Sequence, residues 1–222
     1  MQLRQWWTMG PMARPTTVLK VDKLSKRYGD HTIIDSFSLE VREGEAVALT
    51  GRNGAGKSTL LRCVIGADRP SEGLVEVLGQ KVSESNPEIR RNVATVIDDL
   101  DFFPDLSVVE HLDLLARAHG LDEPDALVDE VLEEVQLVPQ SGQLPGTLSS
   151  GQRRRLALAT ALVRPRKLLV LDEPEQRLDA EGVAWLGERL AVEKRNGLAI
   201  LMASHEPALV EALGCRVVRV GE

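Results

Sequence analysis

A glycine-rich segment of eight residues carries the clearest chemical pattern in this sequence. Residues 51–58 read GRNGAGKS and match the spacing G-x-x-x-x-G-K-[ST], between a short apolar run at 44–51 and a stretch with helical spacing. Glycines let backbone N–H groups close around phosphate oxygens, a lysine adds a cation, and a serine hydroxyl can bind Mg²⁺. The alternative is a glycine-rich turn with an incidental lysine. Such a turn would not need to lie between a strand and a helix, as this segment is expected to do.

The segment therefore predicts a phosphate-binding loop. We expect Lys57 on the β- and γ-phosphates, where it also assists catalysis, and Ser58 on Mg²⁺. The residues expected to contact the nucleotide are Gly51, Arg52, Asn53, Gly54, Ala55, Gly56, Lys57, Ser58 and Thr59.

Two adjacent carboxylates follow the apolar run LLVL at 168–171. If that run is a strand of a parallel sheet, Asp172 and Glu173 lie at its carboxyl edge, where such sheets bind ligands. One carboxylate can hold Mg²⁺ while the next orients or deprotonates an attacking water. Alone, such a pair is more often a solvated turn. Beside a phosphate loop it predicts Asp172 as a magnesium ligand and Glu173 as the catalytic base.

Composition limits the class of protein. The 222 residues are 43% hydrophobic and 27% charged, which is typical of one soluble globular domain. A net charge of −7 argues against broad attraction to nucleic acid or to an anionic membrane. No apolar run approaches the roughly 18 residues that span a bilayer. Cys63 and Cys215 lack CxxC spacing, so the sequence indicates neither a disulfide framework nor a zinc site.

Residues 1–16 lack the apolar segment of a secretory signal. Two interpretations of them stay open: a disordered tail, or a start codon assigned too early, with Met9 or Met12 as the true start. From residue 17 onward, period-two and helical spacings alternate and predict an α/β domain over 17–222 with a mainly parallel sheet covered on both faces. Strands are expected at 17–24, 32–41, 44–51, 73–82, 92–97, 167–174, 198–204 and 215–220. Helices are expected directly after the glycine-rich segment, ending at Gly66, and at 107–120, 125–138, 152–163, 179–197 and 206–213.

Five segments together resemble the nucleotide-binding domain of ATP-binding cassette (ABC) proteins, from about Val18 onward. In the order found in that family they are GRNGAGKST, LSSGQ, LLVLDEP, the LD of QRLD, and SH at 204–205. The resemblance implies a P-loop NTPase core, an N-terminal antiparallel β portion, and an inserted helical subdomain at about 99–165. It also implies a Mg²⁺-dependent ATPase that is active as a dimer.

The resemblance assigns a place to the LSSGQ turn. In this family two domains pair head to tail, and this turn of one domain faces the γ-phosphate of ATP on the other. Ser149, Gly151 and Gln152 would then bind nucleotide in trans, at the positive end of a helix. The alternative is a simple N-cap turn, since serine is a favoured cap. The three arginines at 153–155 span about 300° of a helix, so they cannot all face the nucleotide.

Three further residues match family positions. Tyr28 stands where the family places an aromatic ring on adenine, and His205 stands where a histidine contacts the γ-phosphate and positions Glu173. Asp179 matches the loop that links the two sites of the dimer. All three roles are implied by the resemblance.

Three departures from the family pattern are visible. Asp98 stands where glutamine is usual, and it is either a stronger Mg²⁺ ligand or a residue that does not reach the metal. The residues at 175–177 are bulky where small ones are common, so they either form specific polar contacts at the dimer interface or favour a particular partner. Ser150 replaces the commonest glycine, which is a mild change.

The resulting hypothesis is an ATP-hydrolysing subunit of an ABC transporter, bound to the cytoplasmic face of the cell membrane through a separate membrane-spanning subunit. Its other partner is a second ABC domain, either a copy of this chain or a paralogue, and no nucleic acid is expected. Because the chain ends soon after 215–220, export is favoured over import. Two alternatives stay open: a non-transport ABC ATPase with a soluble partner, and a nucleotide-sensing switch with little turnover.

Overall fold

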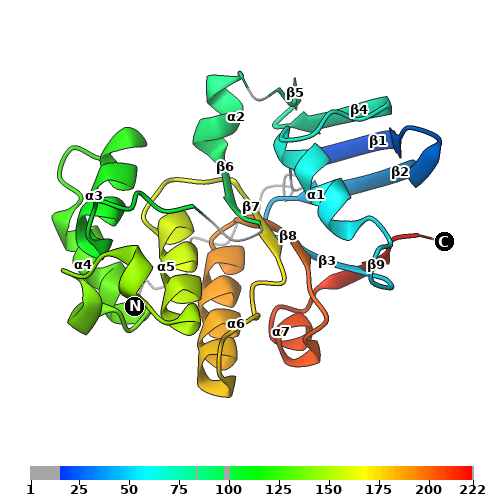
Figure 1. Ribbon diagram of the computed structural model, residues 1–222. Coiled ribbons are helices and arrows are strands. Elements are labelled where there is room, and N and C mark those ends of the chain that lie inside the picture. Colours follow the sequence, from blue (N-terminus) through cyan, green and yellow to red (C-terminus); the bar gives the residue numbers. More distant parts are fainter. Residues whose placement is uncertain (1–15, 84, 98–100, 222) are drawn as a thin grey trace, which may run out of the picture.

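Two sheets form the framework of the protein, one antiparallel and one parallel (Figure 1). A computed structural model describes residues 16–83, 85–97 and 101–221. The antiparallel sheet has the order β2-β1-β4-β5, and the parallel sheet has the order β6-β7-β8-β3-β9. This arrangement confirms the predicted α/β class with an antiparallel portion. The tail predicted at 1–16 lies, apart from Thr16, outside the described residues.

Two strands of the antiparallel sheet extend beyond the ranges that the period-two pattern of the sequence predicts. The members of this sheet are β1 (Thr17–Tyr28), β2 (His31–Arg42), β4 (Glu72–Val77) and β5 (Gln80–Lys81). The single strand predicted at 73–82 is wrong, because Leu78 and Gly79 have positive φ angles of 51° and 74° and turn the chain into a hairpin. Shifts in register interrupt β1, which explains why its period-two pattern fades after residue 24 although pairing continues.

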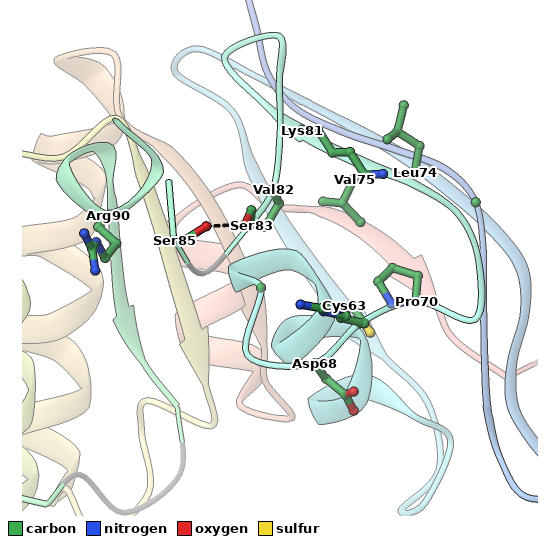
Figure 2. Close-up of a pocket in the computed structure, with 13 residues that line it drawn as sticks. Cys63, Asp68, Pro70, Leu74, Val75, Lys81, Val82, Ser83, Ser85 and Arg90 are labelled. Atoms are coloured by element: carbon green, nitrogen blue, oxygen red, sulfur yellow. Dashed lines mark hydrogen bonds between the residues drawn. The ribbon is translucent and has the colours of Figure 1, made fainter. Parts of the chain in front are cut away.

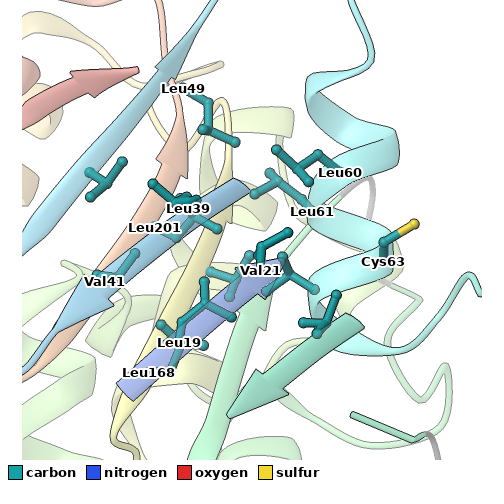
Figure 3. Close-up of a cluster of buried hydrophobic side chains, with 14 of the residues drawn as sticks. Leu19, Val21, Leu39, Val41, Leu49, Leu60, Leu61, Cys63, Leu168 and Leu201 are labelled. Carbon is teal, nitrogen blue, oxygen red and sulfur yellow. The ribbon is translucent and has the colours of Figure 1, made fainter. Parts of the chain in front are cut away.

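One strand of the parallel sheet, β3, is buried on both faces. The sheet consists of β3 (Ala46–Thr50), β6 (Val93–Val96), β7 (Leu168–Asp172), β8 (Ala199–Ala203) and β9 (Arg216–Arg219). Val47 and Leu49 of β3 pack with the antiparallel sheet and with α1 (Lys57–Ile65), as Figure 3 shows for Leu49 beside Leu60 and Leu61. Ala46 and Ala48 belong to the cluster on the opposite face. Strands covered on both sides read as continuous apolar runs, as this one does.

Helices α5 (Ser150–Leu162), α6 (Ala180–Arg195) and α7 (Pro207–Ala212) cover that opposite face. Helices α3 (Val108–Ala118) and α4 (Asp125–Glu134) pack with the far side of α5 around a separate apolar cluster that includes Leu112, Val131 and Leu156. Helix α4 ends four residues before its predicted end, and a short 3₁₀ turn follows at Val138–Gln140. None of the helices in the described residues combines the length and apolar character needed to cross a bilayer.

One helix was not expected from the sequence. Helix α2 (Pro87–Asn92) has only six residues, which is too short for an apolar period to stand out. Its start signal is nevertheless present, because the side chain of Asn86 accepts a hydrogen bond from the N–H of Glu88 and Pro87 occupies the first turn. Capping residues could therefore have located it.

We expect Gly73→Ala to lower the free energy of unfolding by roughly 2–4 kcal/mol. Gly73 has φ +86°, and a Cβ there would lie 2.3 Å from the carbonyl oxygen of Lys23 and 2.6 Å from that of Asp22, both in the backbone of the neighbouring strand β1. Urea unfolding followed by circular dichroism measures the effect. Gly79→Ala is the matched control, since Gly79 also has a positive φ but open space around it, and it should cost about 1 kcal/mol. Equal losses in the two variants would contradict the steric explanation.

Candidate nucleotide-binding site

Three strands of the parallel sheet end side by side. Strands β3 and β7 both pair with β8, and both Leu49 and Asp172 align with Ala203. The loops that follow these strands carry the phosphate loop, Glu173 and His205, respectively. The carboxyl edge of this sheet therefore brings together side chains that are more than 100 residues apart in the sequence, at the place where ligands of open parallel sheets bind.

The phosphate loop has a conformation that requires glycine. Gly51, Gly54 and Gly56 all have positive φ angles, and a Cβ on Gly51 would lie 2.6 Å from the carbonyl oxygen of Val220. Gly56 precedes α1 in a left-handed conformation, and no side chain caps the helix. The first N–H groups of α1 are thus left without a side-chain acceptor, which makes the helix start suitable for an anion.

Lys57 lies at the mouth of this loop with its ammonium group held by backbone oxygens. It is 7% exposed, and Nζ donates to the carbonyl oxygens of Gly51 at 3.0 Å and Arg52 at 3.4 Å. The adjacent Ser58 and Thr59 are half-buried at the start of α1. A buried cation, free helix N–H groups and a neighbouring hydroxyl together suit the phosphates of a nucleotide.

A hairpin of the antiparallel sheet runs beside the loop and presents Tyr28. A Cβ added to Gly56 would lie 3.0 Å from Cγ2 of Ile33. Ile33 belongs to β2, and His31, the first residue of β2, pairs with Tyr28. Tyr28 is 46% exposed, so part of its ring is available to a ligand. This placement is compatible with the predicted adenine contact, which stays a prediction.

Two residues that the sequence did not single out hold the tyrosine ring in place. The Tyr28 hydroxyl donates to a carboxylate oxygen of Asp68, which also forms an ion pair with Lys26. Nζ of Lys26 lies 4.6 Å from the centroid of the ring. The hydrogen bond from Lys26, followed by that from Tyr28, holds the pKa of Asp68 below its usual value. Asp68 is therefore ionised at neutral pH and orients both partners.

The loop after β7 is held by a buried arginine. Nη2 of Arg154 donates to the carbonyl oxygens of Asp172 at 2.8 Å and Glu173 at 2.6 Å, and Nε donates to that of Pro174 at 3.2 Å. Glu173 has a positive φ of 43°, a region that non-glycine residues rarely adopt. Three hydrogen bonds from one guanidinium therefore stabilise a strained turn, a role of Arg154 that the sequence did not predict.

The three arginines point to different places, as the helical geometry requires. Arg153 is exposed, Arg154 is buried, and Arg155 lies 3.3 Å from a carboxylate oxygen of Asp179. Asp179 also caps α6 by accepting a hydrogen bond from the N–H of Gly182 at 2.9 Å. The helix that begins with the LSSGQ turn is thus connected to both ends of the loop at 172–179.

The LSSGQ turn forms the cap of α5. Oγ of Ser149 accepts from the N–H of Gln152 at 3.2 Å, and the side-chain oxygen of Gln152 accepts from the N–H of Ser149 at 2.8 Å. The helix begins at Ser150, two residues before its predicted start. Because the Ser149 hydroxyl accepts in this capping box, its own proton can still be donated, so capping and phosphate binding are compatible. A Cβ added to Gly151 would lie only 3.1 Å from the carbonyl oxygen of Arg177.

Two of the three predicted magnesium ligands, Ser58 and Asp172, lie within the described residues. No group of three or more His, Cys, Asp or Glu side chains gathers as a metal site within the described ranges. Ser58 and Asp172 nevertheless fit Mg²⁺, which commonly takes one or two protein ligands and completes its shell with phosphate and water. Asp98, the third predicted ligand, lies outside the described residues.

A separate hollow of about 800 Å³ lies at the opposite end of α1 from the phosphate loop (Figure 2). Val75 and Lys81 of the antiparallel sheet border it on one side, and Arg90 of α2 borders it on another. None of the predicted site residues is among the residues that line it. Burial raises the pKa of the Cys63 thiol in its wall to about 11, so this thiol is protonated at neutral pH.

Comparisons with known proteins identify the family of this chain. The profile of the family described as ABC transporter matches residues 34–176. The spermidine/putrescine import ATP-binding protein PotA of Pseudomonas aeruginosa is 36% identical over 207 residues, which are 90% of this chain and 56% of that protein. The SkfA peptide export ATP-binding protein SkfE of Bacillus subtilis is 33% identical over 91% of this chain and 85% of that protein. The bacitracin transport ATP-binding protein BcrA of Bacillus licheniformis is 32% identical over 89% of this chain and 65% of that protein.

The chain thus spans little more than half the length of some of these relatives. A solved ATP-binding subunit of an ABC transporter is 31% identical, with a TM-score of 0.85 over 92% of this chain and 86% of that one. A dimeric ATP-binding cassette bound to ADP and phosphate shares the fold at 23% identity, with a TM-score of 0.82 over 91% of this chain and 94% of that one. The family profile covers more than half of the chain, and a third of the aligned residues are identical across nearly all of it. The chain therefore belongs to the ABC transporter family.

Proposed function

We propose that this chain binds and hydrolyses ATP with Mg²⁺ and that hydrolysis drives a separate membrane-spanning subunit. The alignment of the ends of β3, β7 and β8 supports the proposal, because Lys57, the pair Asp172 and Glu173, and His205 all follow strands that end at one edge of the sheet. Ser58 and Asp172 would hold Mg²⁺, which neutralises phosphate charge when bound. Glu173 orients and deprotonates the attacking water, and His205 contacts the γ-phosphate.

The proposed active form is a head-to-tail dimer. Ser149 and Gln152 lie at the exposed start of α5, where a helix N-terminus favours an anion supplied by another chain. The solved cassette described above as a dimer shares this fold, and it supports the same arrangement here. We therefore assign Ser149, Gly151, Gln152 and Asp179 to the site of the partner chain. The partner is a second copy or a paralogue.

A hollow of about 210 Å³ is the proposed contact with the membrane subunit. Thr95 of β6, His111 of α3 and Thr160 of α5 are among the residues that line it, and Phe103 at its rim is 52% exposed. Within the described chain, the buried atoms Nδ1 of His111 and Nε of Arg164 have no hydrogen-bond partner. Exposed aromatic surface at the rim of a hollow suits a protein partner.

The proposed location is the cytoplasmic face of the cell membrane, reached through that partner. The relatives include proteins named for import and for export, so the export favoured by the sequence stays a prediction.

A cassette that acts with a soluble partner is the alternative. Purification of a Glu173→Gln chain with ATP from solubilised cells tests both. Recovery of a polytopic membrane protein supports the transporter, and recovery of soluble proteins alone contradicts it.

We expect Glu173→Gln to lower the rate of phosphate release by at least about 100-fold, because the amide cannot accept the proton of the attacking water. Binding of a fluorescent ATP analogue should stay within a factor of about two of the unmodified chain. Lys57→Ala is the control, since it should abolish binding as well as hydrolysis. A Glu173→Gln chain that hydrolyses ATP at the normal rate would overturn the assignment of the base.

Mixing two inactive variants tests the shared site. Lys57→Ala removes the phosphate-loop cation, and Ser149→Arg blocks the turn expected to face the other chain. In a head-to-tail dimer, half of the mixed population is heterodimeric and each heterodimer keeps one intact site. We expect recovery of about one quarter of the normal ATPase rate if sites act independently. Either variant alone should show none, and absence of recovery on mixing would argue against a site built from two chains.

We expect Phe103→Ala to reduce co-purification of the membrane subunit at least about fivefold, because loss of an exposed aromatic side chain removes a typical interface contact. Leu114→Ala is the matched control: Leu114 is 42% exposed and belongs to α3, but it does not line the hollow. Co-purification is quantified by mass spectrometry at equal amounts of cassette. Equal losses in both variants would place the interface elsewhere.

A further inference from the structure

Glu175 joins the loop after β7 to the loop after β8. Its Oε1 accepts a hydrogen bond from the hydroxyl of Ser204 at 2.8 Å and from the N–H of His205 at 3.2 Å. Ser204 is completely buried, whereas His205 is exposed. One carboxylate oxygen therefore fixes the peptide that carries the histidine while leaving the imidazole accessible.

The contact belongs to a directed chain of hydrogen bonds. Oγ of Ser204 accepts from the N–H of Glu206 at 3.1 Å and donates to Glu175. The hydroxyl is thus oriented from both sides, and the start of α7 is included in the same network. If Glu175 is removed, a buried hydroxyl proton and the N–H of His205 lose their acceptor.

Stability alone does not explain a glutamate at this position. Its second oxygen, Oε2, is buried and accepts no hydrogen bond within the described part of the chain. Burial of a carboxylate oxygen without a partner is unfavourable, so such groups call for a functional explanation. From the sequence, Glu175 is expected only to form polar contacts at the dimer interface or to favour a particular partner, whereas in the structure it joins two loops of its own chain.

The same loop also holds the catalytic carboxylate. The side-chain amide of Gln176 donates to a carboxylate oxygen of Glu173, and the N–H of Glu173 donates to the carbonyl oxygen of Ala203 at 2.8 Å. Arg154 fixes the backbone on the other side of Glu173. The consecutive residues Glu175 and Gln176 therefore contact the backbone of His205 and the carboxylate of Glu173, respectively. In the proposed reaction these two groups lie on either side of the reacting phosphate.

We propose that Glu175 is a positioning residue for ATP hydrolysis, which sets the backbone of His205 relative to Glu173. The inference rests on the proposed ATPase function. Glu175 does not touch the nucleotide. It acts through Ser204 and His205, so its removal should affect the rate of the chemical step more than nucleotide binding.

The test compares Glu175→Ala and Glu175→Gln in the full chain with saturating ATP and Mg²⁺. We expect Glu175→Ala to lower kcat about tenfold while the Kd of a fluorescent ATP analogue changes less than about twofold. Glu175→Gln should restore most of kcat, because an amide oxygen can replace Oε1. Glu211→Gln is the matched control, since Glu211 is an exposed carboxylate on α7, and it should leave kcat unchanged.

A double-mutant cycle separates positioning from general destabilisation. Ser204→Ala should lower kcat like Glu175→Ala, and the double variant should be no slower than either single one, because both changes break one network. A Glu175→Ala chain with normal kcat would overturn the proposal. So would additive losses in the cycle, or a loss of kcat that Glu175→Gln does not restore. If Glu175→Ala fails to fold, Glu175→Gln and Ser204→Ala decide: normal kcat in a folded Ser204→Ala chain overturns the proposal.

These outcomes are distinguishable from failure of the proposed function itself. If the unmodified chain does not hydrolyse ATP with its membrane subunit present, the ATPase assignment is wrong. If the unmodified chain is active, Glu173→Gln is inactive and Glu175→Ala has the normal kcat, only the positioning role of Glu175 is wrong.

Discussion

Burial of β3 on both faces is the constraint on which the rest of the structure depends. Its alternate side chains contact two different apolar clusters, one shared with the antiparallel sheet and α1, and the other with α5, α6 and α7. A strand in that position has its pairing register fixed by burial, and its neighbour β8 is itself buried along its whole length. The register fixes where β7 and β8 end, so the chemistry at the sheet edge follows from packing far from it.

Around this rigid edge, the loops are held by polar contacts. The guanidinium of Arg154 fixes the backbone at Glu173, where the left-handed conformation is unfavourable for a residue with a side chain. Glu175 connects the same loop to Ser204. Because Arg155 also contacts Asp179, helix α5, the loop at 172–179 and the loop that carries Ser204 form one connected set of hydrogen bonds and ion pairs. Movement of α5 in a closing dimer would therefore affect the carboxylate directly.

The sequence predicted the parts of this structure that depend on local spacing. The phosphate loop, the strand before Asp172 and most helices have patterns that stand out within ten residues. The hairpin at Leu78 and Gly79 and the short helix α2 were missed because two or six residues carry too little periodicity. Arg154, Asp68 and Glu175 could not have been assigned, because each acts on residues that only the tertiary fold brings near. The roles of the remaining predicted site residues depend on a nucleotide and a second chain.

The order of strands also affects how the protein is made. Strand β3 is synthesised early, but its two neighbours, β8 and β9, come from the last quarter of the chain. Val220 donates to the carbonyl oxygen of Thr50 at 2.9 Å and packs against the turn at Gly51, so the phosphate loop gains its support only when residue 220 has left the ribosome. During translation the apolar strand β3 stays unpaired until partners about 150 residues later have been synthesised. Such a large separation in sequence slows folding and leaves apolar surface exposed to aggregation. The nascent chain therefore cannot complete the support of its phosphate loop until residue 220 has been synthesised.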